Sequence, residues 1–267
     1  MYTYAFTYHR PKSLAEAAAL FKKSPDAKYV AGGQTLIPTM KQRLASPADL
    51  IDIGGLADLA FVRAGAGAIV IGAGTKHADV AASADVEKAI PALAHLAAHI
   101  GDPAVRHMGT LGGSIANNDP AADYPAAVLG LGASVKTASR TIAADEFFTG
   151  MFATALEEGE IVTEVSFPVP EKAGYAKFPN PASRYAMAGV FVAKTKSGVR
   201  VAVTGAASCV FRMAEMEAAL GKSFTPDAVA NIRVPADGLN SDLHGSAEYR
   251  ANLVTVMAKR AVQAALG

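Results

Sequence analysis

The sequence has only one cysteine, little net charge and no long apolar run. One cysteine, Cys209, cannot form an internal disulfide, and alone it cannot hold an iron–sulfur cluster or a structural zinc ion. The formal net charge of +1 gives no electrostatic reason to expect nucleic acid or an acidic membrane as a partner. No apolar stretch reaches the roughly 18 residues of a membrane span, and the N-terminus lacks a signal-peptide pattern. We therefore expect a cytoplasmic protein whose metal chemistry, if any, does not depend on cysteine.

Local patterns predict helices and strands in both halves of the chain. Ser13 followed by Glu16 is a capping-box pattern that starts a helix. Pro91 interrupts a helical pattern over residues 86–100, which predicts either two helices or a late start. Short apolar runs that end at glycine predict buried strands at 27–33, 50–55 and 68–75.

The pattern changes after Gly174. A hairpin is predicted there with its turn at 196–198, followed by amphipathic helices over 211–221 and 246–267. We therefore place a boundary near residue 174, between an α/β part and a part made of a hairpin and helices.

Several nucleotide-binding motifs are incomplete. The stretches 72–77 and 130–135 each contain two glycines of G-x-G-x-x-G but lack the third, which argues against a Rossmann site. The stretch 219–223 resembles a phosphate-binding loop, but Met216 replaces the glycine that the loop requires.

Two hydrolytic motifs are also incomplete. The sequence GGSIA at 112–116 misses the nucleophile elbow by one residue, because Ala116 replaces its last glycine, so a serine hydrolase rests on that near miss alone. His95 and His99 are four residues apart, but no glutamate follows His95 to give H-E-x-x-H. A solvated or capped helix face is the alternative for this histidine pair.

Two segments share one physical design: AGGQT at 31–35 and TLGGS at 110–114. Adjacent glycines leave backbone N–H groups open to close approach, and successive N–H groups can form an anion-binding nest. Two such loops facing each other would suit a pyrophosphate without any lysine or arginine. Either loop alone is equally explained as a tight turn between strand and helix. A third glycine segment at 72–75 favours a dinucleotide held outside a Rossmann fold.

A carboxylate follows the second glycine pair. Asp123 lies thirteen residues after Thr110, where an ionised carboxylate could accept hydrogen bonds from ribose or ribityl hydroxyls. Asp119 and Pro120 can instead simply start a turn.

These motifs, in this order, carry a family resemblance. AGGQTLIPTMKQRLASP, GAGTKHADV, IGDPAVRHMGTLGGSIANNDPAADYPA and GEIVTEVSFPVP resemble the FAD-binding medium subunit of the xanthine dehydrogenase/carbon monoxide dehydrogenase family of molybdenum hydroxylases. The similarity continues through KFPNPASRYAMAGVFVAK and SDLHGSAEYRANLVTVMAKRAVQAA, so it covers nearly the whole chain.

The resemblance implies an α+β fold. Its FAD-binding domain, residues 1–174, would be of the vanillyl-alcohol-oxidase (PCMH) type, with two subdomains that divide near residue 55. A small C-terminal domain of sheet plus helices, residues 175–267, would follow. The resemblance also implies partners: a large molybdopterin subunit and a small subunit with 2Fe-2S clusters, assembled as a dimer of heterotrimers. The single cysteine fits a flavin-only chain.

The resemblance also implies a set of FAD-binding residues. In it, the diphosphate lies against the first glycine motif, Asp123 holds a sugar-like hydroxyl, and Lys177 and Tyr185 lie near the isoalloxazine ring. Gln34 stands where some related flavoproteins attach FAD through histidine, which implies non-covalent FAD. The full set is Ala31, Gly32, Gly33, Gln34, Thr35, Leu36, Thr110, Gly112, Gly113, Ser114, Asp123, Ile161, Lys177 and Tyr185, with no catalytic or metal-binding residue.

Three functions compete. In the leading one, the chain passes electrons from a 2Fe-2S partner through FAD to an external acceptor. The alternatives are a free-standing FAD-dependent oxidase or dehydrogenase, and a flavin-free scaffold that only docks partners. The first alternative lacks a spare acid–base constellation, and the second does not account for the intact glycine motifs. The substrate and the terminal acceptor are chosen outside this sequence.

Overall fold

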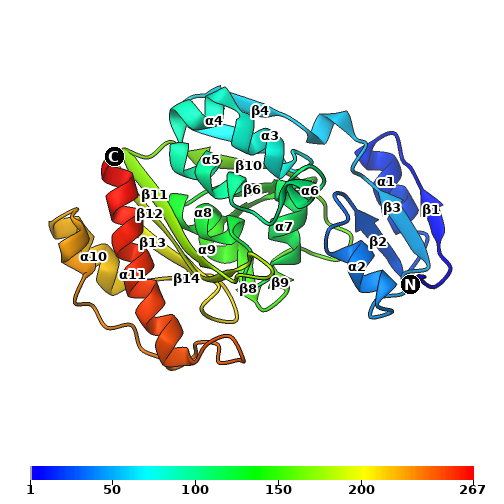
Figure 1. Cartoon of the computed structure of the whole chain (residues 1–267). Helices are drawn as coiled ribbons and strands as arrows, with labels where there is room; N and C mark the ends of the chain where they lie inside the picture. Colours follow the sequence, from blue (N-terminus) through cyan, green and yellow to red (C-terminus); the bar gives the residue numbers. More distant parts are fainter. Residues whose placement is uncertain (1) are drawn as a thin grey trace.

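The computed structural model describes residues 2–267 and consists of three units that follow one another along the molecule (Figure 1). The N-terminal unit is a parallel sheet with strand order β1-β3-β2 and two helices. Ser13 caps its first helix, accepting from the Glu16 N–H at 3.1 Å, while the Glu16 carboxylate accepts from the Lys12 N–H at 2.7 Å. The elements are β1 (Thr7–His9), α1 (Leu14–Phe21), β2 (Ala27–Val30), α2 (Leu36–Lys41) and β3 (Asp49–Asp52).

The middle unit is built on a five-stranded antiparallel sheet with the order β4-β5-β10-β6-β7. Pro91 is the first residue of a helix, where its missing N–H costs nothing, so the helical pattern over 86–100 forms two helices, as one of the two predicted readings had it. Its strands are β4 (Val62–Gly65), β5 (Ala68–Gly72), β6 (Ser134–Thr137), β7 (Thr141–Ala143), β8 (Phe148–Gly150), β9 (Ala153–Thr154) and β10 (Val162–Pro168). Its helices are η1 (Ala57–Leu59), α3 (His77–Ala82), α4 (Ala84–Ala89), α5 (Pro91–Ala98), α6 (Pro103–Arg106), α7 (Leu111–Asn117), α8 (Tyr124–Leu131) and α9 (Ala144–Phe147).

The C-terminal unit is a four-stranded antiparallel sheet with helices on its outer side (Figure 1). The predicted hairpin is confirmed, because β12 and β13 pair from Thr195 opposite Gly198. The elements are β11 (Lys172–Pro179), β12 (Ala186–Thr195), β13 (Gly198–Thr204), β14 (Phe211–Arg212), α10 (Ala214–Lys222), η2 (Pro226–Val229) and α11 (Ala247–Leu266). Among the described residues, no helix is both long and apolar enough to cross a membrane.

Strand β12 is buried on both faces, which joins the C-terminal sheet to the middle unit. Phe191 belongs to the core of the middle unit, whereas Val190 and Val192 pack in a separate core with α10 and α11. A Cβ on Gly130 of helix α8 would lie 2.9 Å from the Phe191 ring, so this helix rests directly on the sheet. The predicted boundary near Gly174 falls inside β11, at the edge of this shared core.

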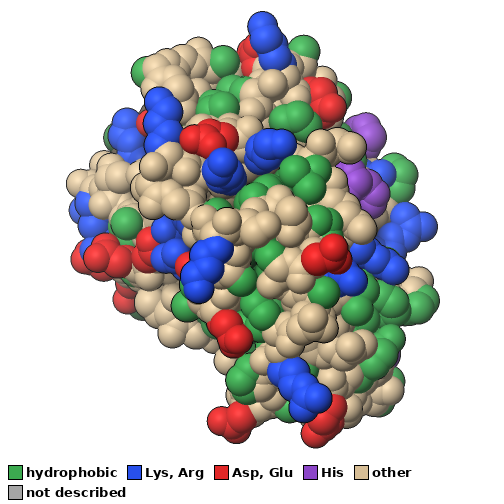
Figure 2. All heavy atoms as spheres, turned by 90° about the vertical axis from the view of Figure 1, so that its left-hand side faces the viewer, with side chains coloured by type: hydrophobic (Ala, Val, Ile, Leu, Met, Phe, Trp, Pro, Cys, Tyr) green, Lys and Arg blue, Asp and Glu red, His purple; other side chains and the backbone are tan. Residues whose placement is uncertain are grey.

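The face of the C-terminal unit turned to the viewer in Figure 2 mixes basic and acidic side chains. It shows no broad field of one sign. This distribution agrees with the net charge of +1.

We predict that Phe191→Ala destabilises the whole chain in one transition rather than only its C-terminal part. Phe191 is fully buried between α8 and the sheet, so the truncation should lower the free energy of unfolding by about 3–5 kcal/mol. Phe191→Leu, which keeps more of the volume, is the matched control and should cost less. Denaturant unfolding followed by circular dichroism measures both. An early separate transition in Phe191→Ala would show that the two parts do not share a core.

Candidate functional site: a cleft between the N-terminal and middle units

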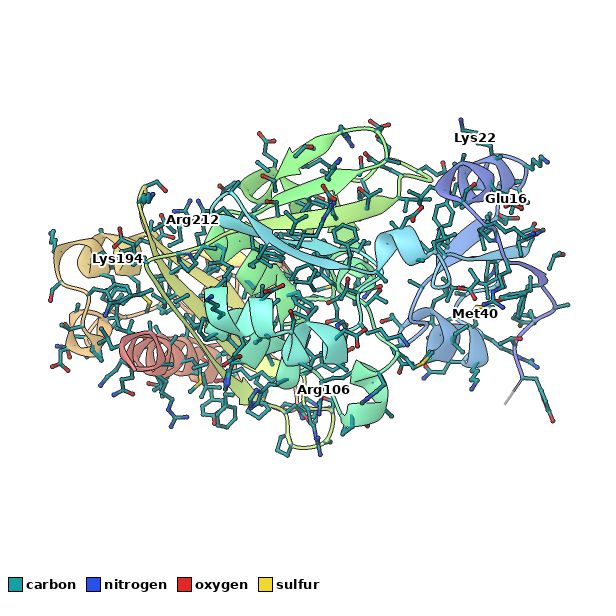
Figure 3. All side chains as sticks on the ribbon, turned by 90° about the horizontal axis from the view of Figure 1, so that it is seen from above. Glu16, Lys22, Met40, Arg106, Lys194 and Arg212 are labelled. Carbon is teal, nitrogen blue, oxygen red and sulfur yellow. The ribbon has the colours of Figure 1, made fainter. Side chains whose placement is uncertain are left out.

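A cleft of about 690 Å³ is lined by residues of the N-terminal and middle units and by the loop before β12. Figure 3 shows the N-terminal unit, marked by Glu16, Lys22 and Met40, beside the middle unit, where α6 carries Arg106. The volume lies in the range of cofactor sites. Every predicted site residue except Lys177 lines this cleft: Ala31, Gly32, Gly33, Gln34, Thr35, Leu36, Thr110, Gly112, Gly113, Ser114, Asp123, Ile161 and Tyr185.

The first glycine motif forms a nest of backbone donors. The N–H groups of residues 32–36 have no acceptor within the part of the chain that the structure describes. Gly33 has φ +70°, a backbone conformation that favours glycine. Thr35 precedes α2 but its side chain makes no capping hydrogen bond, so the N–H of Leu36, the first residue of this helix, stays free. The next N–H, that of Ile37, donates to the Gly33 carbonyl at 3.1 Å. Successive free N–H groups of this kind bind anions.

The second glycine motif is not a loop, so that part of the prediction is wrong. Thr110 is the N-cap of α7, and Gly112, Gly113 and Ser114 lie inside this helix. Their N–H groups donate to the Ala73 carbonyl at 2.8 Å, the Thr110 hydroxyl at 3.2 Å and the Thr110 carbonyl at 3.0 Å. These N–H groups cannot form a second nest, because a local cap and a neighbouring strand end use them.

Glycine is required in this second motif for close packing. A Cβ on Gly112 would lie 2.5 Å from the Ala73 Cβ. The first motif shows the same need for close packing, because a Cβ on Gly32 would lie 2.2 Å from the Met108 carbonyl oxygen. The second motif contributes side-chain hydroxyl groups to the lining of the cleft. Thr110 and Ser114 line it, and neither donates a hydrogen bond to another described residue.

The third glycine segment also lacks free donors. The N–H groups of Ala73, Gly74 and Thr75 donate to Thr163, Leu59 and Gly72 carbonyls at 2.9, 2.7 and 3.0 Å. This segment leads from β5 to α3, and its Ala73 and Thr75 carbonyls accept from the first N–H groups of α7. The sequence argument that counted it as a third anion loop therefore does not hold.

Asp123 sits in a buried charge network at one side of the cleft. Lys177 Nζ contacts Asp123 Oδ1 at 2.9 Å and Oδ2 at 3.1 Å, and the Tyr175 hydroxyl donates to Oδ1. Burial raises the pKa of Asp123, and the Lys177 ammonium and the Tyr175 hydroxyl oppose that shift. Lys177 also donates to the His99 carbonyl at 2.8 Å, and it does not line the cleft. The structure thus places Lys177 behind Asp123 and not at the cleft surface.

Ile161, just before β10 of the middle unit, and Tyr185, just before β12 of the C-terminal unit, both line the cleft. Ile161 is buried against Ala17, Ala27 and Ile51 of the N-terminal unit, so it also fastens the two units together. Tyr185 is 45% exposed, and burial of its ring raises the pKa of its hydroxyl. It follows Arg184, which has φ +62° in a tight loop.

Sequence reasoning missed other residues of the cleft. The unassigned polar residues that line it include Lys28, Thr39, His77, Asn117, Asp119, Glu160, Ser183 and Arg184. Lys28 could have been found, because it lies two residues before Val30 in the strand that leads into the first glycine motif. His77 gave no local signal, since its position depends on contacts with the distant Gly109.

His77 is a buried neutral histidine. It is 4% exposed, and burial together with the charge of Arg106 lowers its pKa to about 4. Its ring lies 5.4 Å from that of Tyr124, measured between centroids.

Fold and cleft together define a protein of three units, with a cofactor-sized cleft between the first two into which a glycine-rich turn brings backbone donors. The family model described as "FAD binding domain in molybdopterin dehydrogenase" matches residues 4–170, and "CO dehydrogenase flavoprotein C-terminal domain" matches residues 175–265. The chain is 38% identical to the carbon monoxide dehydrogenase medium chain of Hydrogenophaga pseudoflava, covering 97% of this chain and 96% of that one. It is 36% identical to the nicotine 6-hydroxylase medium subunit of Paenarthrobacter nicotinovorans, with the same coverage.

A solved structure gives the same result. A chain of the carbon monoxide dehydrogenase from Hydrogenophaga pseudoflava, in a form that lacks the Mo-pyranopterin moiety, superposes with a TM-score of 0.89 at 39% identity over 100% of this chain and 99% of that one. The chain therefore belongs to the family of FAD-binding medium subunits of molybdenum-hydroxylase-type dehydrogenases. This confirms the family, the α+β fold class, FAD as the cofactor and the oxidoreductase class.

We predict that Asp123→Ala destabilises the fold, because it leaves the buried Lys177 ammonium without a negatively charged partner. Lys177 is only 6% exposed, and removing one member of a buried pair should cost about 3–5 kcal/mol. The double variant Asp123→Ala/Lys177→Met removes the stranded charge and should recover much of the loss. Thermal or urea unfolding of both variants measures this, and equal stability of the two would argue against a charge effect.

We also predict a pH effect from His77. The unfolded chain takes up a proton on this residue near pH 6.5, whereas the folded chain resists protonation down to about 4. The free energy of unfolding should therefore fall as pH drops through this window, by about 3 kcal/mol in total. His77→Phe should lack this contribution. Urea unfolding of wild type and His77→Phe at several pH values measures the difference, and parallel pH profiles would contradict it.

Proposed function

We propose that this chain binds FAD non-covalently in the cleft, with the diphosphate held by the N–H groups of residues 32–36. The observation that supports this most is the run of consecutive N–H groups without acceptors in a glycine turn that opens a helix. Phosphate oxygens match such donors without a cation. Gln34 cannot attach a flavin through an imidazole, which supports non-covalent binding.

The remaining cleft residues have distinct proposed roles. The Thr110 and Ser114 hydroxyls would donate to FAD oxygens, and Leu36 and Ile161 would supply apolar contact. Asp123 would accept from a sugar-like hydroxyl, with Lys177 keeping its carboxylate ionised from behind. Tyr185, which is partly exposed at the cleft, would lie near the ring system.

Bound FAD would supply a redox centre that accepts electrons from an iron–sulfur partner and passes them to an external acceptor. This chain's own residues bind and orient it, and no acid–base constellation for a substrate is required of them. The proposed partners are a large molybdopterin subunit and a small 2Fe-2S subunit, in a dimer of heterotrimers located in the cytoplasm. The names of the relatives, medium chain and medium subunit, support a larger and a smaller partner chain. The single cysteine also agrees with clusters that lie in another chain.

We predict that Gly33→Val sharply lowers FAD content. Gly33 has φ +70°, and a Cβ would lie 3.0 Å from Ile37 Cγ1, so a branched side chain would distort the turn that aligns the free N–H groups. Gly65→Val is the matched control, since a Cβ there meets nothing within 4 Å. Flavin absorbance per protein measures occupancy after circular dichroism has established folding. Full occupancy in folded Gly33→Val would refute the assignment of the nest.

The function itself is tested by reconstitution. The isolated chain should reduce poorly with any organic substrate and should accept electrons once the iron–sulfur and molybdopterin subunits are added. Tyr185→Phe should alter the flavin reoxidation rate without abolishing FAD binding. Stopped-flow absorbance follows reduction and reoxidation. Substrate turnover by the isolated chain at the rate of the complex would instead support a free-standing flavoenzyme.

A further inference from the structure

His77 is positioned at the junction of the two glycine motifs. The backbone N–H of His77 donates to the Gly109 carbonyl at 3.0 Å, and the neighbouring residues Lys76 and Thr110 form an antiparallel β-bridge. These contacts fix the start of α3 against the segment that leads into α7. A Cβ on Gly109 would lie 2.6 Å from His77 Nε2. Glycine at 109 therefore keeps this ring nitrogen uncovered.

The two ring nitrogens of His77 differ in access. Nδ1 is sealed from solvent without a hydrogen-bond partner within the described chain, whereas Nε2 is not sealed and His77 lines the cleft. The imidazole is neutral near neutral pH, so it carries one proton. A buried N–H without an acceptor is tolerated less well than an unpaired acceptor. The proton therefore belongs on Nε2, which makes Nε2 a donor toward the cleft.

The nest lies next to this donor. A Cβ on Gly32 would lie 2.6 Å from the Gly109 Cα, so Gly109 is in contact with both the first residue of the nest and His77 Nε2. Building on the proposed FAD function, we propose that His77 is a further cofactor-binding residue whose Nε2–H donates to the FAD diphosphate. It adds a neutral donor from the middle unit to the backbone donors of the N-terminal unit.

His77→Phe removes the donor and keeps an aromatic ring against Tyr124, while His77→Gln retains an Nε2–H donor on a flexible side chain. The full-length chain is titrated with FAD, with ADP-ribose, which contains the diphosphate, and with riboflavin, which has no phosphate. A hydrogen bond to a charged oxygen predicts about tenfold weaker binding of FAD and ADP-ribose to His77→Phe, with riboflavin unchanged. His77→Gln should recover most of this loss.

Two outcomes would overturn the proposal: unchanged FAD affinity in His77→Phe, or an equal loss for riboflavin, which would indicate a packing effect. If wild type does not bind FAD at all, the proposed function fails together with this inference. A test without any variant of the ring uses ¹⁵N-histidine labelling of the wild type. ADP-ribose should shift the His77 Nε2 resonance and riboflavin should not. An Nε2 resonance that stays unmoved by bound ADP-ribose would contradict the proposal even if His77→Phe failed to fold.

Discussion

The cleft depends on one close backbone contact between Gly32 and the Met108–Gly109 segment. A Cβ at residue 32 would lie 2.2 Å from the Met108 carbonyl oxygen, a distance that no side chain tolerates. This contact brings the N-terminal unit against the middle unit at the base of the cleft. On one side of it begins the run of free N–H groups, and on the other begins α7 with its hydroxyl side chains. The absence of a side chain at one position therefore sets how closely the two halves of the site approach.

The FAD site proposed above would hold the diphosphate mainly through neutral donors. Asp123 and Lys177 neutralise each other below the surface, and burial keeps His77 neutral. The donors proposed to bind the diphosphate are backbone N–H groups and hydroxyls, whose positions are fixed by the fold, whereas those of cationic side chains are flexible. Lys28 and Arg184 are the cationic side chains that line it. Orientation of dipoles, more than net charge, defines this site, which agrees with the near-neutral composition of the chain.

Sequence reasoning succeeded where the cause was local. Ser13 and Glu16 predicted a helix start because a cap involves residues only a few positions apart, and Pro91 divided two helices for the same reason. Reasoning from spacing failed for the second glycine motif. AGGQT and TLGGS look alike, but Thr110 caps a helix and Ala73 packs against Gly112, and Ala73 is far away in the sequence.

The same limit explains Lys177 and His77. Lys177 lies 54 residues from Asp123, and only the contact between strand β11 and the N-cap residue of α8 shows that the two form a pair. His77 acquires its open Nε2 from Gly109, across more than thirty residues of intervening helices. The family resemblance could place Lys177 near the flavin site, but it could not show that the Lys177 ammonium forms an ion pair with Asp123.

The C-terminal unit is part of the site although it contributes little of the cleft surface. Its strand β11 supplies Tyr175 and Lys177 to Asp123. Its strand β13 holds the segment before α8, because the Thr204 hydroxyl donates to the Ala122 carbonyl at 2.6 Å and the Gly205 N–H donates to the Pro120 carbonyl at 2.8 Å. These hydrogen bonds hold the backbone just before Asp123, and the buried core that contains Phe191 packs the C-terminal sheet against the middle unit. The position of a carboxylate in the cleft between the first two units is thus determined by the third, which gives a physical reason for all three to belong to one chain.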